Sequence, residues 1–358
     1  MEIRYSFWKD KKALVTGHTG FKGSWLCLWL NKMGANVSGL SLNDPVSNPD
    51  LYSILDLDEL VNDNRGDITQ FDICMDIIKK TAPEIIFHMA AQPLVRRSYV
   101  DPITTYHTNV MGTANILESA RYCGSVKTIV VITTDKCYEN IEKNYAYKEN
   151  DPLGGYDPYS SSKACAEHVS SAYYRSFFKE KNVGLATARA GNVIGGGDWS
   201  ADRLIPDAIK TWLKNDKLKV RYPQSTRPWQ HVLDPLLGYL LLAEKLWKKP
   251  EEFSGGWNFG PDQNSVKTVQ ATIELMSNVW GDSVDWVASS ENHLHEANLL
   301  QLNSEKSNSR LGWKPRLDFD EAVNKTINWY KAYYTNNQEM MEYTLNQIAE
   351  YESRNINV

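Results

Sequence analysis

The sequence has no apolar run long enough to cross a membrane, and its cysteines are few. A membrane-spanning helix needs about 20 mostly apolar residues, whereas the best apolar runs, at 84–91 and 128–133, are far shorter. The opening segment MEIRYSFWKDKK lacks the apolar stretch of a signal peptide. The 5 cysteines are scattered without Cys-x-x-Cys spacing, which is typical of reduced thiols and argues against a zinc site. We expect a cytoplasmic protein without membrane contacts.

Excess positive charge, repeats and low-complexity tracts are also missing. The chain has 39 Lys and Arg against 44 Asp and Glu, a formal net charge of −5, so it offers no basic field for nucleic acid. Hydrophobic residues make up 42% and charged residues 23% of the 358 residues, which is ordinary for a folded chain. At about 100–200 residues per domain, this length allows two domains or one large unit with a smaller lobe. No nucleic-acid partner is expected.

Residues 1–190 alternate short apolar runs with longer helical patterns, which is typical of βαβ units on a parallel sheet. Beyond Gly191, the glycine-rich loop GNVIGGGDW is followed by short helical patterns and by loops with Pro and Trp. We predict a Rossmann-type doubly wound parallel α/β sheet with a smaller C-terminal α/β lobe. The expected strands cover 13–15, 37–42, 85–89, 128–133 and 183–190, and the expected helices cover 23–33, 71–80, 104–122 and 158–178.

Three glycines, Gly17, Gly20 and Gly23, lie between the first expected strand and the first expected helix. Glycine permits a tight turn and lets a phosphate approach the backbone, and the N-terminus of the following helix offers free N–H groups and a positive dipole end. The spacing alone also fits an ordinary turn, but its position between a strand and a helix indicates a dinucleotide-binding site.

The acidic residue that usually follows such a turn is displaced. An Asp or Glu about 20 residues further on would bind the adenosine ribose, but the second expected strand ends Ser41-Leu42-Asn43-Asp44. A polar side chain or Asp44 must therefore serve. No Arg lies in this stretch to bind a 2′-phosphate, which favours NAD over NADP. Asp67 suits an adenine contact at the end of the third strand, although alone it would fit a surface turn.

These observations divide the chain into three parts. We assign residues 1–190 to an NAD-binding Rossmann domain, to which some later segments return because no linker separates them. Residues 191–335 form a substrate-binding lobe. Residues 336–358 form a C-terminal amphipathic helix, since the apolar residues of this tail share one helical face.

Tyr159 and Lys163 are four residues apart at the start of an expected helix and therefore share one face. The ammonium can lie beside the phenol and lower its pKa from about 10, so that the phenolate accepts a hydroxyl proton while a hydride leaves for a nicotinamide. A solvated helical pair is the ordinary alternative. The helix-start residues around Tyr159 and the upstream glycine turn favour catalysis.

Thr134, Asp135 and Lys136 follow the strongest expected strand. Ligands of open parallel sheets bind beyond the carboxyl ends of the strands, so these side chains should face the same crevice as Tyr159. Thr134 can hydrogen-bond the substrate oxygen that Tyr159 deprotonates. Asp135 and Lys136 make an acid/base pair that a simple dehydrogenase does not need, whereas a capping Asp and a solvated Lys are the alternative.

At these residues the chain resembles the extended short-chain dehydrogenase/reductase family, and within it the sugar-nucleotide 4,6-dehydratases. The resemblance is strongest to members that act on CDP-D-glucose, and it covers nearly the whole chain. It is carried by the glycine turn, HMAAQ at 88–92, Thr108-Asn109, TTDKCYEN at 133–140, DPLGGYDPYSSSK at 151–163 and the late loops.

The resemblance implies a tightly bound NAD that is reduced and reoxidised within one turnover. Tyr159 would act as base while C4 of the glucose loses a hydride, water would leave across C5–C6, and the hydride would return to C6 to give a 4-keto-6-deoxy sugar. Asp135 would be the acid for the C6 hydroxyl. Most relatives have Glu at the position of Lys136, so Lys136 either acts as the C5 base in neutral form or stabilises the enolate while another group moves the proton.

The resemblance also implies the site residues; without it, each arginine among them would be taken as a surface residue or a structural ion pair. The implied catalytic set is Thr134, Asp135, Lys136, Tyr159 and Lys163. The implied cofactor-binding set is Gly17, Thr19, Gly20, Phe21, Lys22, Gly23, Asp67, Ile68, Ala90, Ala91, Gln92, Asn109, Thr133, Tyr159 and Lys163. The implied substrate-binding set is Gln92, Thr134, Asn192, Arg203, Leu204, Arg227 and His231.

No metal is expected, because His293 and His295 have no third ligand nearby and are taken as surface histidines. The tryptophans are numerous, at 12. Trp25 and Trp29 are expected in the core, while Trp199 and Trp229 fall in loops, where they either wall the substrate site or simply pack.

The resemblance further implies a homodimer or homotetramer, because the family pairs two long helices of each subunit, here 104–122 and 158–178. By analogy, the product would feed deoxysugar synthesis for a bacterial surface polysaccharide such as lipopolysaccharide O-antigen. Two other functions stay open. A sugar-nucleotide 4-epimerase would need Tyr159 and Lys163 but no pair at 135 and 136, and a non-catalytic dinucleotide-binding regulator would need none of them.

Overall fold

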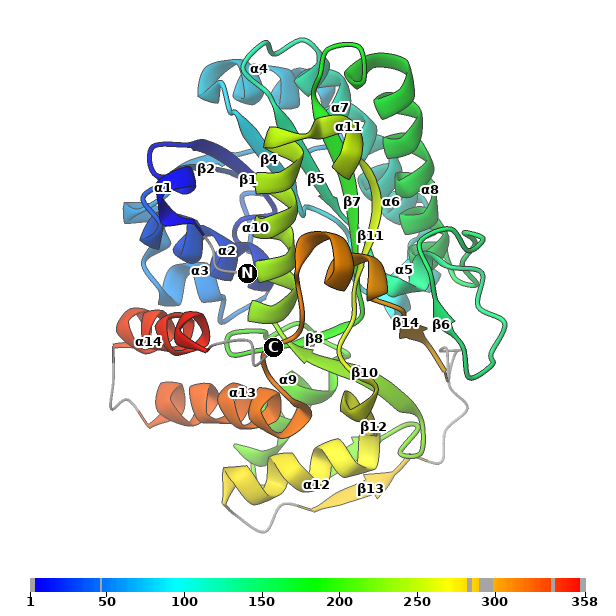
Figure 1. Cartoon of the computed structure of the whole chain (residues 1–358). Coiled ribbons are helices and arrows are strands. Elements are labelled where there is room, and N and C mark those ends of the chain that lie inside the picture. The colour runs from blue at the N-terminus through cyan, green and yellow to red at the C-terminus, as the bar shows by residue number, and fades with distance from the viewer. Residues whose placement is uncertain (1–3, 46, 282–284, 290–298, 336–338, 355–358) are drawn as a thin grey trace.

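The structure is a computed structural model that describes residues 4–45, 47–281, 285–289, 299–335 and 339–354. Its centre is a sheet of seven parallel strands in the order β11-β7-β5-β4-β1-β2-β3 (Figure 1). The predicted Rossmann-type sheet is therefore confirmed. These strands are β1 Lys12–Thr16, β2 Asn36–Ser41, β3 Asn62–Arg65, β4 Ile85–His88, β5 Thr128–Ile132, β7 Gly184–Ala190 and β11 Gly255–Phe259.

The strand order reverses between β1 and β4. The chain runs outward from β1 through β2 to β3 and then returns to the other side of β1 with β4. At such a switch point the loops after the two strands diverge, which opens a crevice at the carboxyl ends of the strands. The fold thus places the glycine turn after β1 and the HMAAQ segment after β4 on the two walls of one crevice.

Helices cover both faces of the large sheet because the strand side chains alternate between two cores. Val130 and Ile132 of β5 belong to the cluster that includes the helices α2 and α10, whereas Ile129 and Val131 belong to the cluster that includes α4 and α7. Figure 1 shows α10 crossing in front of the sheet and α4 and α7 behind it. The bounds of the covering helices are α2 Phe21–Lys32, α4 Phe71–Thr81, α7 Gly112–Arg121, α8 Pro158–Tyr173 and α10 Leu233–Lys248.

The two long predicted helices are present but contain π-helical turns. The first runs through α6 (Pro102–Tyr106), the π segment η2 (His107–Met111) and α7. The second runs through α8 and ends in the π segment η4 (Tyr174–Phe178). Periodicity alone does not report such turns, because one extra residue shifts the apolar face without ending the helix.

A smaller lobe lies below the large sheet in Figure 1 and is built around short strands. Its elements are β8 Asn192–Ile194, α9 Leu204–Trp212, β9 Leu218–Val220, β10 Thr226–His231, β12 Val266–Thr268, α12 Val269–Trp280, β13 Trp286–Ala288 and α13 Phe319–Tyr334. Strand β11, at 255–259, pairs with β7 in the large sheet. The domain division at residue 190 stays a prediction.

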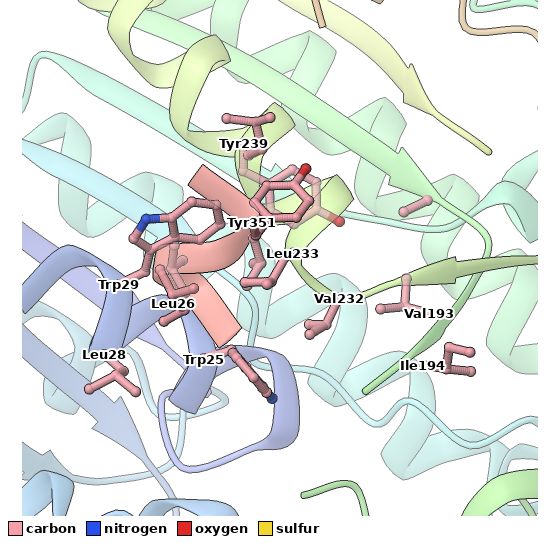
Figure 2. Packing of buried hydrophobic residues seen from close by; sticks show 14 of the residues in the cluster. Trp25, Leu26, Leu28, Trp29, Val193, Ile194, Val232, Leu233, Tyr239 and Tyr351 are labelled. Carbon is pink, nitrogen blue, oxygen red and sulfur yellow. The ribbon is translucent and has the colours of Figure 1, made fainter. Parts of the chain in front are cut away.

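The C-terminal segment forms α14 (Met340–Ser353), which packs against α2 and α13. Figure 2 shows Tyr351 of α14 above Trp29 of α2, with their rings edge to face at 5.8 Å. Glu352 accepts hydrogen bonds from Trp29 Nε1 at 2.7 Å and from Lys32 Nζ at 2.5 Å. Trp25 and Trp29 are fully buried, as predicted.

The short elements that complete the described chain lie in its connections. They are α1 Tyr5–Trp8, α3 Leu51–Ile54, η1 Leu57–Glu59, α5 Val95–Val100, η3 Asp135–Cys137, β6 Ala146–Tyr147, α11 Pro250–Phe253, η5 Gln263–Ser265, β14 Gln301–Leu302 and η6 Ser307–Leu311. Among the helices described, none is both long and apolar enough to span a bilayer. The five cysteines are free thiols.

Candidate active site

A cavity of about 1000 Å³ occupies the crevice at the carboxyl ends of the strands. Its wall brings together residues that are far apart in the sequence, from the glycine turn to the loop before β10. The predicted site residues that line it are Gly17, Thr19, Gly20, Phe21, Lys22, Gly23, Asp67, Ile68, Ala90, Ala91, Gln92, Thr133, Thr134, Asp135, Lys136, Tyr159, Lys163, Asn192, Arg203, Leu204 and Arg227. Asn109 and His231 do not line it.

The glycine turn is closed by contacts that no larger residue permits. A Cβ atom on Gly23 would lie 2.1 Å from the carbonyl oxygen of Gly17, and one on Gly17, where φ is +73°, would lie 2.8 Å from the nitrogen of Ala90. Helix α2 then begins after Gly20, with no side chain capping its N-terminus and no acidic residue in its first turn. The free N–H groups and the helix dipole point to an anionic ligand.

The far end of this cavity, beyond the glycine turn, is polar but not cationic. Ser41, Asp44, Ser47 and Asp67 line it, and the carboxylate of Asp67 accepts a hydrogen bond from the Thr69 nitrogen at 2.8 Å. An adenosine ribose and base fit such a lining, because they offer hydroxyl and amine donors to oxygen acceptors. The chain thus presents the surroundings that a dinucleotide requires along one continuous wall.

Asn109 is buried beneath the cavity wall and holds two of its segments together. Its Oδ1 accepts from the Gln92 nitrogen at 2.8 Å, and its Nδ2 donates to the Gln92 carbonyl at 3.1 Å and to Ser162 Oγ at 2.8 Å. With its amide engaged in this way, Asn109 supports the segment after β4 and the helix that carries Tyr159. Asn109 does not itself line the cavity, and its expected direct contact with the cofactor stays a prediction.

Tyr159 and Lys163 lie side by side on α8, buried at the base of the cavity. The Lys163 ammonium donates to the carbonyl of Ile132 at 3.0 Å, and burial lowers the pKa of Lys163 to about 8. Burial also raises the pKa of Tyr159 to about 12, against the opposing effects of a hydrogen bond with Thr134 and of the Arg203 guanidinium. The predicted lowering of the Tyr159 pKa is therefore not found, because desolvation of the phenol outweighs the nearby cations.

The strand-end residues meet Tyr159 across the cavity. Thr134 Oγ1 donates to Asp135 Oδ1 at 2.9 Å, and Lys136 Nζ lies 3.7 Å from the same oxygen. The other oxygen of Asp135 is buried and has no hydrogen-bond partner among the described residues. A buried carboxyl oxygen without a partner is costly, so this atom is available to a ligand group in the cavity.

The cations of the cavity gather near Tyr159. Arg203 Nη1 donates to Asp198 Oδ2 at 2.7 Å, and its charge reaches both Tyr159 and Lys22. Burial, together with the charges of Arg203 and Lys163, lowers the pKa of Lys22 to about 7. Asp198 is one of the cavity residues that the sequence analysis did not predict. It follows three glycines in a loop, a context without any periodic signal.

His231 lies behind the cavity in the core. It is fully buried, its ring stands edge-on to Trp25 at 6.0 Å, and its Nδ1 accepts from the Leu233 nitrogen at 3.4 Å. His231 does not line the cavity, and its expected direct contact with the substrate stays a prediction. Arg227, on β10, does line the cavity.

Trp199 and Trp229 both line the cavity while most of their surface is packed, but Trp229 lies on strand β10 and not in the expected loop. Trp199 stands edge-on to Tyr330 of α13 at 5.7 Å and donates to Tyr334. Tyr330 itself reaches the cavity and donates to the Asp198 carbonyl. The sequence did not predict Tyr330, because it lies in a helix far along the chain from Asp198 and no local pattern indicates that it reaches the cavity. His293 and His295 lie outside the described residues, among which no cluster of three metal-ligating side chains occurs.

A Rossmann sheet with a glycine turn after its first strand and a Tyr-x-x-x-Lys pair facing it defines the extended short-chain dehydrogenase/reductase class. Comparison with known proteins is more specific. The family model described as GDP-mannose 4,6 dehydratase matches residues 14–326, which is most of the chain, and the chain belongs to this family.

Curated relatives match over nearly the full length. The chain is 49% identical over 356 residues to the CDP-glucose 4,6-dehydratase of Salmonella typhimurium, with 98% of this chain and 99% of that protein covered. It is 27% identical over 340 residues to the human dTDP-D-glucose 4,6-dehydratase, with 91% of each covered.

Solved structures confirm the fold. The dTDP-glucose 4,6-dehydratase of Bacillus anthracis, in complex with NAD, has a TM-score of 0.76 at 23% identity and covers 93% of this chain and 99% of that one. The UDP-glucose 4-epimerase of Thermotoga maritima has a TM-score of 0.78 at 21% identity, with 90% and 99% covered. Dehydratases and epimerases thus share this architecture, and the side chains of the site must distinguish them.

Proposed function

We propose that this protein is an NAD-dependent hydro-lyase that converts CDP-D-glucose to CDP-4-keto-6-deoxy-D-glucose and water. The observation that carries the reaction type is Asp135, whose buried carboxyl faces the cavity beside Tyr159 with one oxygen unpartnered. An epimerase has no use for an acid at this position. The choice of nucleotide follows the relative from Salmonella typhimurium, which is named for CDP-glucose and is 49% identical.

The residues present fit NAD. The pyrophosphate would lie at the uncapped N-terminus of α2, in the turn whose close backbone packing requires Gly17 and Gly23, and the adenosine would lie toward Ser41 and Asp67. When bound there, NAD supplies an acceptor for the hydride of C4 and later a donor of that hydride to C6. Lys163 would hold the nicotinamide ribose next to Tyr159.

Tyr159 is the base that takes the proton of the C4 hydroxyl as that carbon is oxidised. Its pKa is raised by burial, so the free phenol keeps its proton until a positive charge lies close enough to stabilise the phenolate. Arg203, whose charge already lowers the pKa of Tyr159 against the effect of burial, stabilises the developing phenolate. Thr134 orients the sugar oxygen through its own hydroxyl.

Asp135 donates a proton to the C6 hydroxyl, which then leaves as water, while the C5 proton made acidic by the 4-ketone is removed. Lys136, with its Nζ 3.7 Å from Asp135, is the nearest cation to these carbons. It serves either as the base at C5 or as the charge that stabilises the enolate. Arg203 and Arg227 bind the substrate diphosphate, since guanidinium groups pair with phosphate oxygens.

The test is incubation of the purified protein with CDP-glucose, UDP-glucose, dTDP-glucose and GDP-mannose, each with and without added NAD. We expect CDP-glucose alone to lose the mass of one water and to give the alkali-sensitive absorbance of a 4-keto sugar. An isomer of unchanged mass would support the epimerase instead. Absence of any product from CDP-glucose would refute the proposal.

We further propose that the protein acts in the cytoplasm as a homo-oligomer. The outward face of α6, η2 and α7 exposes apolar residues at helical spacing, including Ile103 (77% exposed) and Met111 (49% exposed). Exposed apolar side chains grouped on one face are typical of a subunit interface.

A further inference from the structure

A buried imidazole sits behind the adenosine end of the cavity and contacts the side chain that faces the ligand there. His18, within the glycine turn, is fully buried. Its Nε2 lies 2.9 Å from Asp63 Oδ1, and its Nδ1 lies 2.9 Å from Ser41 Oγ. Ser41 is the last residue of β2 and lines the cavity.

The surroundings fix this imidazole in one orientation. A Cβ on Gly39 would lie 2.3 Å from the His18 ring, so glycine at 39 makes the slot in which the ring lies. Tyr52 stands edge-on to the ring at 5.0 Å. The ring therefore cannot turn away from Ser41 or Asp63 without a change in the backbone.

The hydrogen bonds determine which groups donate. A carboxylate can only accept, and Asp63 forms an ion pair with the Arg65 guanidinium at 2.7 Å. Nε2 of His18 must therefore carry the proton and donate to Asp63. In the neutral ring Nδ1 is then an acceptor, so the hydroxyl of Ser41 donates to it. Burial lowers the pKa of His18, which keeps the ring neutral at neutral pH.

Ser41 consequently presents only an acceptor to the cavity. Its one proton is engaged by His18, and one lone pair accepts the Thr19 N–H at 3.3 Å. Because Ser41 lines the cavity, the second lone pair is left to accept from a ligand there. A ribose hydroxyl can donate to it, whereas a phosphate monoester carries acceptor oxygens and about two negative charges and cannot.

The cations near this position are committed elsewhere. Among the described cavity-lining residues of segments 41–51 and 66–68 there is no Lys or Arg, and Asp44 adds a negative charge. Arg65 on β3 is the register partner of Ser41 on β2. Its Nε donates to Asp63 at 2.9 Å, however, and its Nη1 donates to the Leu42 carbonyl at 3.0 Å.

We infer that His18 is a specificity-determining residue for the cofactor: by fixing Ser41 as a hydrogen-bond acceptor, it selects a free adenosine 2′-hydroxyl and rejects a 2′-phosphate. This inference rests on the proposed NAD site and assigns the discrimination to a relay from Asp63 through His18 to Ser41. The sequence lacks the usual acidic residue that would accept from the adenosine ribose. Ser41 can take over that role as an obligate acceptor only when the His18 ring behind it is held in one tautomer.

The experiment measures dissociation constants for NAD and NADP on the full chain, freed of bound nucleotide, by calorimetry. His18→Phe keeps a ring in the Gly39 slot but frees the Ser41 proton, which can then donate to a phosphate. Ser41→Ala removes the acceptor. Loss of one hydrogen bond corresponds to about 2- to 10-fold in affinity. We expect His18→Phe to tighten NADP and Ser41→Ala to weaken NAD, so that the NADP-to-NAD ratio of dissociation constants falls about 5- to 10-fold in each.

Ser47→Ala is the matched control, because Ser47 lines the same end of the cavity but donates to the Pro49 carbonyl at 3.0 Å. Its ratio should equal that of the unaltered chain. A ratio unchanged in both His18→Phe and Ser41→Ala, with NAD still bound by the unaltered chain, would overturn this inference alone. Failure of the unaltered chain to bind NAD would overturn the proposed function and this inference together.

Discussion

The surroundings of Tyr159 show how one residue can depart from its expected electrostatics without losing its role. Tyr159 and Lys163 are four positions apart on α8, yet the lysine donates to the carbonyl of Ile132 and burial raises the pKa of the phenol. The spacing predicts proximity but says nothing of desolvation, because burial depends on side chains that are distant in the sequence. Arg203, held by Asp198, is the cation whose charge opposes that shift.

At the scale of single residues, Asp135→Asn tests whether Asp135 is the acid that protonates the C6 hydroxyl. The amide keeps the shape of the side chain but cannot protonate a leaving hydroxyl, and general acid catalysis contributes about 10²- to 10⁴-fold. We expect kcat for water loss to fall by this factor, while oxidation at C4 still occurs. The measurements are product mass after quenching and absorbance at 340 nm.

Asp135→Glu is the comparison for this variant, since it retains an acid and should recover part of the rate. Full turnover by Asp135→Asn would assign the proton to another group. A loss of thermal stability in that variant without the 340 nm signal would indicate a structural role for the carboxyl.

A second residue-scale prediction concerns Asp234, which is buried in α10 and joins it to α14. Its Oδ1 accepts from Tyr351 OH at 2.7 Å and from the Arg316 nitrogen at 2.8 Å, and burial raises its pKa from 3.8 to about 7. A carboxyl with a raised folded pKa contributes stability that is complete below the unfolded value and is lost as pH rises through about 7. This term amounts to roughly 4 kcal/mol.

In Asp234→Asn the side chain stays neutral, so this loss disappears. We expect the free energy of unfolding of the variant, minus that of the unaltered chain, to increase as the pH rises from 4 to 8. Urea unfolding at three pH values in this range measures it. Parallel curves at all three would contradict the assigned shift.

At the scale of elements, the strand-turn-helix unit of β1 and α2 carries the cofactor site. Gly23→Ala would put a methyl group 2.1 Å from the Gly17 carbonyl oxygen, so the turn must open and the free N–H groups of α2 must move. We expect NAD affinity to fall by more than about 10-fold, since several charge-assisted hydrogen bonds depend on this geometry. NAD titration and thermal unfolding measure the effect.

The control at this scale is Gly124→Ala, because nothing lies within 4 Å of a Cβ at Gly124. Such a substitution should be neutral or slightly stabilising. Equal NAD affinity in Gly23→Ala and Gly124→Ala would show that the close packing of the turn does not govern the site.

Elements with a strong local pattern were predictable, and contacts between distant elements were not. The strand over 128–133 and the helix over 71–80 follow directly from apolar spacing, and both are present as β5 and α4. Asp135 reaches the cavity because it follows β5 at the carboxyl edge of the sheet, and Tyr159 reaches it from the first turn of α8. By contrast, Asp198, Tyr330 and the imidazole of His18 occupy their places through tertiary packing, which no spacing in the sequence encodes. The same holds for Asn109 and His231, whose motifs are adjacent to the site but whose side chains point into the core.

At the scale of the whole molecule, the large sheet, the lobe and the long helices separate three tasks. The loops at the carboxyl ends of the sheet and residues of the lobe line one cavity, and α7 lies behind the sheet in Figure 1. An acidic chain that binds two anionic ligands must concentrate cations locally. Lys22, Lys163, Arg203 and Arg227 all line the one cavity, whereas the outer helical face is free to serve assembly.

Met111→Lys tests that assembly. Met111 is 49% exposed on η2. In an apolar interface between identical subunits, a lysine at this position would bury one unpaired charge from each subunit, and burying both charges opposes association. We expect light scattering after size exclusion to give a multiple of 40.8 kDa for the unaltered chain and 40.8 kDa for the variant. Leu213→Lys, 43% exposed at the end of α9, is the control and should keep the assembled mass. A monomeric unaltered chain, or a Met111→Lys variant of undiminished mass, would place the interface elsewhere or remove it.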